Sequence, residues 1–278
     1  MRFASKVLDL SQPQVMGILN VTPDSFSDGG NFNRLDNALR QAEKMIADGA
    51  SIIDVGGEST RPGAAEVQMQ QELDRVIPVI TAISQRFDTV ISIDTSKAMV
   101  MQEAIVAGAG MINDVRALQN EGCLDVAASC DVPICLMHMQ GMPRTMQDNP
   151  VYHDIIGDIN QFFKQRIDAC NKAGIDRKRL ILDPGYGFGK TLEQNYQLLA
   201  RQAELLSLGL PILSGMSRKS MIGNLLNCDV EQRLAGSLSA AVIAAIHGAS
   251  IIRVHDVKQT VDALAVLEYT TKWTQAGA

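Results

Sequence analysis

The stretch Gly49-Ala50-Ser51-Ile52-Ile53-Asp54 returns twice in altered form, as Gly108-Ala109-Gly110-Met111-Ile112-Asn113 and as Gly248-Ala249-Ser250-Ile251-Ile252-Arg253. Each copy has a glycine where a helix is expected to end, then small residues, an apolar run and a polar residue. A short apolar run between such signals is typical of a buried strand. Because the pattern repeats in one register, it indicates a single strand unit that is used several times.

Further short apolar runs of this kind lie outward from the three copies, separated by segments with the apolar spacing of helices. Together they give eight strand–helix units, with no linker rich in Pro, Gly or Ser between them. Alternating strands and helices predict a parallel sheet, and eight units in 278 residues favour a (β/α)8 barrel over an open doubly wound sheet. We therefore expect residues 1–278 to form one α/β domain, a TIM barrel with its active site at the C-terminal ends of the strands.

Composition narrows the class of protein further. Hydrophobic residues make up 46% of the chain and charged residues 20%, which is ordinary for a globular protein. The net charge of −6 argues against nonspecific nucleic-acid binding. The N-terminus lacks the pattern of a signal peptide, and the run Leu234–Ile246 is too short to span a bilayer. Five cysteines without a CxxC pair predict neither disulfides nor a zinc site, but buried thiols in a reducing compartment, the cytoplasm.

Polar residues follow the predicted strands, although the strands themselves are nearly all apolar. Strand C-terminal ends share one face of such a barrel, so these side chains are expected to form one site. Two of them have simpler alternative roles: Asn20 as the cap of an Asx turn, and Asp54 as a brace for the turn at Gly56 and Gly57. The residues at the eight strand ends are Asn20, Asp54, Asp94, Asn113, His138, Asp183, Ser214 and Arg253.

The chemistry of these residue types indicates a heterocyclic ligand with an anionic group. Asp94, Asn113 and Asp183 combine carboxylate and amide groups, which can read the donors and acceptors of an amino-pyrimidine edge. Asn20 could bind a hard cation such as Mg²⁺ through its amide oxygen, with phosphate oxygens and water completing the shell. Positive charge for a phosphate or diphosphate is available at Arg61, Lys219, Arg253 and His255.

The motif Gly187-Phe188-Gly189-Lys190-Thr191 is similar to the end of a phosphate-binding Walker A loop. That loop requires a glycine five positions before its second glycine, and Pro184 occupies this position. Nucleotide hydrolysis is therefore not expected, and Lys190 is interpreted as a solvated loop residue. Thr191 and Gln194 predict a capping box at the start of the next helix.

Motifs along nearly the whole chain resemble those of the dihydropteroate synthase family, in order and with none missing. The matching stretches are GILNVTPDSFSDGG (17–30), DVGGESTRPG (54–63), IDT (93–95), ND (113–114), DPGYGFGK (183–190), SRKS (217–220) and RVHD (253–256). The resemblance implies an enzyme that condenses 6-hydroxymethyl-7,8-dihydropterin diphosphate with p-aminobenzoate, giving 7,8-dihydropteroate and diphosphate. It also implies Mg²⁺ as cofactor, a role in folate synthesis, a family of sulfonamide targets and a homodimer, for which Leu234–Ile246 is a candidate contact.

The resemblance also implies a division of roles among residues of this chain. The pterin would be held by Asp94, Asn113, Asp183 and Lys219. The diphosphate would be bound by Arg61, Arg253 and His255, and the metal by Asn20. The p-aminobenzoate would be framed by Phe26, Thr60, Pro62 and Ser220. The groups expected to be catalytic are Lys219, Arg253, His255 and Asp94.

Two other functions are compatible with a pterin-binding barrel. One is a methyltransferase that uses methyltetrahydrofolate, which would not need the basic groups of SRKS and RVH or the STRP loop. The other is a non-catalytic pterin-binding paralogue, against which the full set of polar residues argues.

Overall fold

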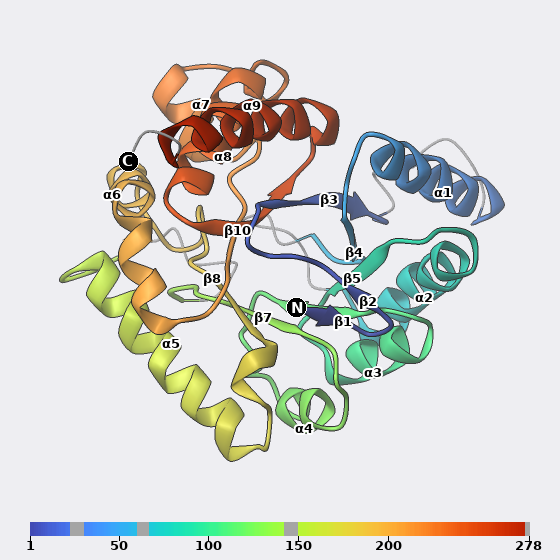
Figure 1. Cartoon of the computed structure of the whole chain (residues 1–278). Coiled ribbons are helices and arrows are strands. Elements are labelled where there is room, and N and C mark those ends of the chain that lie inside the picture. The colour runs from blue at the N-terminus through green and yellow to red at the C-terminus, as the bar shows by residue number, and fades with distance from the viewer. Residues whose placement is uncertain (23–30, 60–66, 142–149, 276–278) are drawn as a thin grey trace.

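The computed structural model describes residues 1–22, 31–59, 67–141 and 150–275, except the side chains of 31–33 and 274–275. Parallel strands close into a barrel in the order β10-β3-β4-β5-β6-β7-β8-β9, and helices surround it (Figure 1). The predicted (β/α)8 TIM barrel is therefore confirmed. The strands are β3 Gln14–Asn20, β4 Ile52–Gly56, β5 Val90–Asp94, β6 Met111–Asp114, β7 Ile134–Met137, β8 Leu180–Asp183, β9 Ile212–Ser214 and β10 Ala249–Val254.

Helices follow the strands much as the apolar spacing predicts. The predicted capping box is present, since Thr191 and Gln194 exchange side-chain-to-backbone hydrogen bonds at the start of α6. The helices are α1 Asn31–Ala47, α2 Met69–Arg86, α3 Ala98–Val106, α4 Cys123–Ala128, α5 Ile155–Lys172, α6 Leu192–Arg201, α7 Ser220–Leu226, α8 Leu234–Ile246 and α9 Val257–Gln275. Short 3₁₀ helices are η2 Arg177–Arg179, η3 Gln202–Leu208 and η4 Val230–Gln232.

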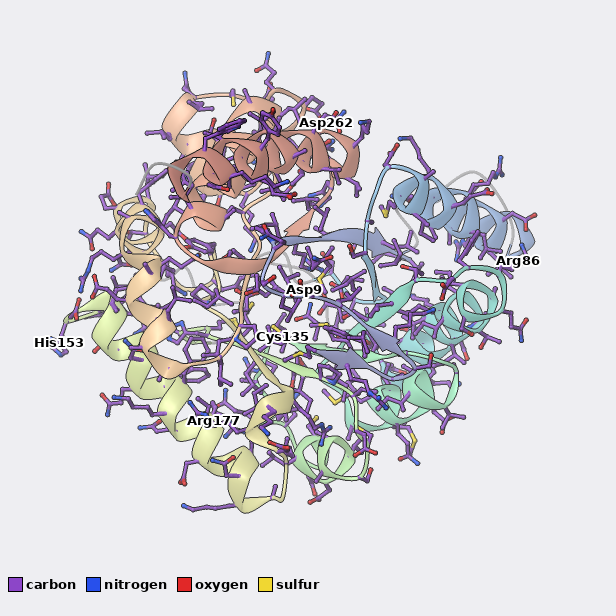
Figure 2. All side chains as sticks on the ribbon, in the orientation of Figure 1. Asp9, Arg86, Cys135, His153, Arg177 and Asp262 are labelled. Carbon is purple, nitrogen blue, oxygen red and sulfur yellow. The ribbon has the colours of Figure 1, made fainter. Side chains whose placement is uncertain are left out.

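One layer of side chains fills the N-terminal half of the barrel. A small antiparallel hairpin, β1 Arg2–Phe3 with β2 Lys6–Val7, adds Phe3 to this layer, in which Cys135 lies near the barrel axis (Figure 2). The strand residues of the layer are Met16, Ile52, Val90, Met111, Cys135, Ile181, Leu213 and Ile251. Since side chains alternate along a strand, the next inward positions lie two residues on. In β4, β6, β8 and β10 these positions hold Asp54, Asn113, Asp183 and Arg253. The apolar layer therefore fixes the strand register that points these four polar side chains into the barrel, nearer its C-terminal end.

Most of the remaining apolar side chains of the strands pack outward against the helices in a second, larger core. All five cysteines are free thiols, and three of them are buried. Within the described ranges, no helix is long and apolar enough to cross a membrane.

Candidate active site

The strand register brings several predicted site residues into one row. Asn20 pairs with Gly56, Gly56 with Asp94, and Asp94 with Asn113, each on the neighbouring strand. Asp94 and Asn113 are buried, whereas Asn20 is partly exposed. The row therefore places an amide and a carboxylate side by side at the C-terminal end of the barrel.

Arg253 on β10, the strand next to β3, joins this row through two ion pairs. Its Nε donates to Asp54 Oδ2 at 2.6 Å, and its Nη2 donates to Asp94 Oδ2 at 2.8 Å. Asn113 Nδ2 donates to the same Asp54 oxygen at 3.1 Å. Asp54 lies in the middle of β4, so its predicted position at a strand end is wrong. It braces Arg253 and Asn113 directly, because a fully buried carboxylate needs a cation or donors beside it.

Burial in this mixed cluster shifts the pKa values of its members. Burial raises the pKa of Asp94 to about 7, against the opposing effect of Arg253. Burial also raises the pKa of Asp183, which Lys219 partly offsets. The pKa of Lys219 falls to about 8 for the same reason, with Asp183 opposing the change. For Arg253, the attraction of Asp54 and Asp94 outweighs burial and keeps its pKa above the ordinary value.

Lys219 reaches the site from the residue before α7. Its Nζ donates to the Tyr186 carbonyl oxygen at 2.5 Å and lies 4.6 Å from the centre of the Phe188 ring. Phe188 packs on Met137, with Val115 and Met139 partly buried beside them. A small apolar wall therefore stands next to the Lys219 ammonium, and the sequence motifs alone did not indicate it.

The loops after β9 and β10 are tied together around His255. Ser217 Oγ accepts a hydrogen bond from the His255 backbone N–H at 3.1 Å and lies 3.1 Å from His255 Nδ1. Arg218 forms an ion pair with Asp256 in the same pair of loops. Ser220 is exposed at the first position of α7. His255 is held at the rim of the barrel, close in sequence to Arg253.

Two polar residues after strands do not point into the row. Ser214 is fully buried and donates to Gln202 Oε1 at 2.7 Å, so its position at a strand end has a structural role. His138 contacts Lys190, whose side chain is only 2% exposed. The interpretation of Lys190 as a solvated loop residue is therefore wrong. The Lys190 ammonium lies beneath the preceding loop, where it donates to the carbonyl oxygens of Gly185 and Phe188.

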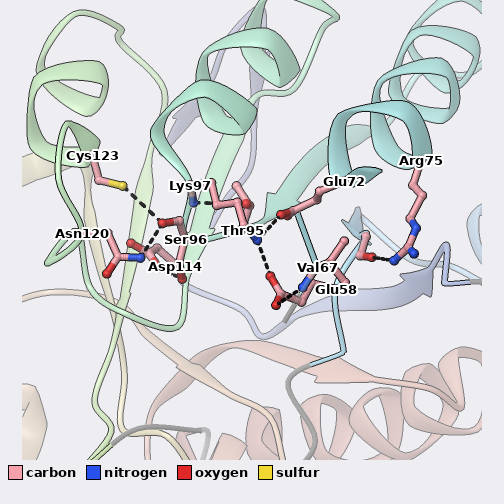
Figure 3. A network of polar contacts seen from close by, with 11 residues as sticks. Glu58, Val67, Glu72, Arg75, Thr95, Ser96, Lys97, Asp114, Asn120 and Cys123 are labelled. Atoms are coloured by element: carbon pink, nitrogen blue, oxygen red, sulfur yellow. Dashed lines mark hydrogen bonds and ion pairs between the residues drawn. The ribbon is translucent and has the colours of Figure 1, made fainter. Parts of the chain in front are cut away.

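A further polar network lies beside the site, between the starts of α2 and α3 (Figure 3). Lys97 Nζ donates to Glu72 Oε2 at 2.6 Å and also pairs with Glu58. Glu58 Oε1 in turn accepts from the Val67 backbone N–H at 3.0 Å. The hydrogen bonds that Lys97 donates to both carboxylates outweigh the effect of burial and raise the pKa of Lys97. Sequence reasoning missed this network, because a lysine and two glutamates so far apart show no local pattern.

Four of the predicted site residues, Phe26, Thr60, Arg61 and Pro62, lie outside the described residues. Glu58 and Val67, which flank three of them in the chain, are joined by the hydrogen bond described above.

A cation site at Asn20 can be tested against the local geometry. A methyl group placed on Gly56 would lie 3.6 Å from Asn20 Oδ1 and 3.7 Å from Asp94 Oδ2. The bare glycine thus lies near an amide oxygen and a carboxylate oxygen, the kind of ligand that Mg²⁺ prefers, and Asp94 Oδ2 also accepts a hydrogen bond from Arg253 Nη2. The residues present fit a hard cation.

Comparison with known proteins identifies the family. The pterin binding enzyme family matches residues 16–255. The curated dihydropteroate synthase of Escherichia coli K12 is 60% identical over 263 residues, which is 95% of this chain and 93% of that protein. The chain belongs to the dihydropteroate synthase family. The Haemophilus influenzae dihydropteroate synthase is 54% identical, over 96% of this chain and 97% of that protein.

Solved dihydropteroate synthases share the fold closely. A Yersinia pestis enzyme in complex with a sulfonamide drug has a TM-score of 0.94 and 58% identity, covering 98% of this chain and 99% of that one. A Xanthomonas albilineans enzyme with 4-aminobenzoic acid has a TM-score of 0.92 and 48% identity, covering 97% of both chains. The family predicted from the motifs is confirmed.

Proposed function

We propose that this chain condenses 6-hydroxymethyl-7,8-dihydropterin diphosphate with p-aminobenzoate, forming 7,8-dihydropteroate and releasing diphosphate. The observation that carries this proposal is the buried group of Asp94, Asn113 and Asp183, with Arg253 and Lys219 beside it. Carboxylates and an amide suit the amino-pyrimidine edge of a pterin, and the cations suit the diphosphate. Met137 and Phe188 offer an apolar wall to the flat ring.

The reaction needs little from the protein beyond binding and exclusion of water. The bond from the pterin methylene carbon to oxygen breaks, and its electron pair leaves with the diphosphate. The aromatic amine nitrogen then bonds to this carbon and releases a proton. An electron-rich dihydropterin stabilises the intermediate cation, and an aromatic amine is unprotonated at pH 7. The catalytic task is therefore electrostatic, which suits a site with fixed cations and no nucleophile–base pair in the proposed set.

Each group has a proposed part in this scheme. Asp94, Asn113, Asp183 and Lys219 bind the pterin, while Arg253 and His255 stabilise the departing diphosphate, together with Arg61. We place p-aminobenzoate against Ser220, with Phe26, Thr60 and Pro62 as its further contacts. Asn20 would hold Mg²⁺, with Asp94 nearby. The metal, when bound, supplies positive charge that weakens the bond to the diphosphate.

We further infer that the protein acts in the cytoplasm as a homodimer and that residues 1–278 fold as one domain. The reducing cytoplasm suits its five free cysteines.

The decisive assay measures diphosphate release from the pterin diphosphate with and without p-aminobenzoate. We expect release that depends on the amine and yields 7,8-dihydropteroate. A methyltransferase or a non-catalytic paralogue would release no diphosphate under either condition, and this result would refute the proposal.

Asp183→Asn tests the pterin site without disturbing the fold. The amide oxygen can still accept the hydrogen bond that Gly185 N–H donates to Asp183 Oδ1 at 2.7 Å. The lost carboxylate should weaken pterin binding by roughly 1.5–3 kcal/mol, as expected for a charged hydrogen-bond partner. Calorimetry with a bare pterin measures this loss, and wild-type affinity would remove Asp183 from the proposed site.

A further inference from the structure

Lys190 places a buried ammonium group beside, but outside, the proposed pterin site. Its Nζ donates to the carbonyl oxygens of Gly185 at 2.9 Å and Phe188 at 3.1 Å. The third contact is with His138 Nδ1, also at 3.1 Å. Lys190 is only 2% exposed, and these contacts of its ammonium are with the backbone of one turn and with one imidazole.

The turn that Lys190 holds is the segment 184–189 after β8. Gly185, Gly187 and Gly189 all have positive φ angles, of 70°, 79° and 60°. A side chain at Gly185 would overlap the His138 carbonyl oxygen, and one at Gly189 would press on the Gln140 backbone. The turn therefore packs directly on the chain that leaves β7, with the ammonium of Lys190 beneath it.

The other side of the same turn meets the groups assigned to the pterin. Tyr186 provides the carbonyl oxygen to which Lys219 donates, and Phe188 lies under the Lys219 ammonium. A side chain at Gly187 would come within 3.2 Å of Lys219 Cδ. Movement of the turn would therefore move Phe188 and Lys219 with it.

The three contacts of Lys190 can be satisfied in both of its charge states. A charged ammonium has three N–H groups and no acceptor, so His138 Nδ1 must then accept and its Nε2 must carry the proton. A neutral amine has two N–H groups for the carbonyls and one lone pair, which can accept from a protonated Nδ1 of a neutral His138. A change of histidine tautomer thus preserves every contact when the lysine loses its proton.

The surroundings allow Lys190 to titrate near neutral pH. Burial lowers the pKa of Lys190 to about 7; Asp183 on β8 opposes this change, and Lys219 adds to it. Burial and Lys190 keep the pKa of His138 well below its ordinary value, so the imidazole stays neutral. Among the described residues, Tyr152 also faces Lys190, with its ring centre 5.9 Å from Nζ and its hydroxyl donating to the Gly189 carbonyl oxygen.

We propose that Lys190 and His138 form a positioning pair, which holds the 184–189 turn, and with it Phe188 and Lys219, ready for the pterin diphosphate in either charge state of the lysine. Neither residue is proposed to touch substrate. The inference rests on the assignment of Asp183 and Lys219 to the pterin in the proposed function.

The binding test uses Lys190→Met, which keeps the apolar stem but removes all three donors, with Lys178→Met at an exposed lysine as the matched control. We expect Lys190→Met to raise the Kd for a bare pterin roughly tenfold. A change of this size corresponds to the loss of about one hydrogen bond. The KM for p-aminobenzoate, measured at saturating pterin diphosphate, should stay within about twofold of the wild-type value. An unchanged pterin Kd, or equal losses for both substrates, would overturn the proposal.

A second measurement uses the wild-type protein, so it does not depend on the variant folding. Nitrogen NMR of ¹⁵N-histidine-labelled protein should show His138 changing from the Nε2–H to the Nδ1–H tautomer as pH rises through 7, while remaining neutral. One tautomer at every pH, or a charged imidazole, would refute the pair. Because this signature needs no ligand, it separates a failure of the pair from a failure of the pterin assignment, which Asp183→Asn tests.

Discussion

Arg253 and His255 are both proposed to bind the diphosphate, but the structure makes them very different as experimental targets. Arg253 forms ion pairs with Asp54 and Asp94, so its removal would take from two buried carboxylates the ion-pair partner that they have among the described residues and would destabilise the protein strongly. His255 is partly exposed at the rim, in contact with Ser217. A defect in His255→Ala is therefore easier to assign to ligand binding.

We expect His255→Ala to weaken the pterin diphosphate by about 1–2 kcal/mol, the value of a charge-assisted hydrogen bond, and to leave the bare pterin alcohol unaffected. Calorimetry with both ligands measures the difference. His153→Ala, at an exposed histidine near the start of α5, is the control. Equal losses for the two ligands would show that His255 does not recognise the diphosphate.

Lys190 also predicts how stability depends on pH. Its pKa is about 7 in the folded protein and near 10.5 when exposed. Between these values the unfolded chain holds a proton that the folded chain lacks, so this contribution to the free energy of unfolding rises with pH. The contribution is lost as pH falls through 7.

The free energy of unfolding of wild type minus that of Lys190→Met should therefore increase from pH 7 to pH 9.5. The limiting slope is about 1.4 kcal/mol per pH unit. Urea unfolding at several pH values measures it. A flat difference would mean that Lys190 keeps its proton throughout this range.

At the level of elements, the turn after β8 is tightly constrained by its neighbours and by its positive φ angles. Gly185→Ala adds a methyl group against the His138 carbonyl oxygen, at a positive φ angle of 70°. We expect a loss of about 3 kcal/mol or more in the free energy of unfolding, from the left-handed backbone and the overlap together.

Gly174→Ala is the matched control for this substitution. Gly174 also has a positive φ angle, of 84°, but nothing lies within 4 Å of the added methyl group. Gly174→Ala should lose only about 1–2 kcal/mol of the free energy of unfolding, because only the left-handed conformation opposes the substitution. Equal losses in the two variants, measured by urea unfolding, would show that the turn moves freely away from His138.

Elements and site residues were predictable to different degrees, for identifiable physical reasons. The positions of Asp94, Asn113 and Asp183 near the C-terminal ends of buried strands could be predicted, because an apolar run that ends on a polar residue is a local pattern. The partners of Arg253 could not be found this way, because Asp54 lies 199 residues away in sequence and Asp94 lies 159 away. These ion pairs exist only once the barrel has closed.

Lys190 shows a second limit of the sequence. Pro184 distinguished its motif from a nucleotide-binding loop, but a lysine in a polar loop was interpreted as solvated. Only the left-handed turn at Gly185, Gly187 and Gly189 directs its side chain inward. The hairpin β1–β2 escaped prediction for another reason, since strands of two residues have no periodicity to detect.

At the scale of the whole molecule, apolar side chains remain exposed on one side of the barrel, over α7, α8 and α9, which are grouped together in Figure 1. Exposed apolar surface of this extent on neighbouring helices indicates an interaction site. The residues concerned are Leu225, Leu226, Leu234, Ile243, Ile246, Val266, Tyr269 and Trp273. Three of them, Leu234, Ile243 and Ile246, lie on α8, the helix predicted from the sequence as a candidate dimer contact.

We expect the protein to be a dimer at micromolar concentration, with this surface buried between two copies. Ile246 is 61% exposed at the end of α8, and Ile246→Glu would place a charge inside the contact, where it has no partner. Sedimentation equilibrium should then show a monomer, or a dissociation constant raised at least roughly tenfold. Val106→Glu is the control, because Val106 is 78% exposed on α3, away from the three helices in Figure 1. A monomeric wild-type protein would refute the dimer, and a dimer lost only in Val106→Glu would place the contact on α3 instead.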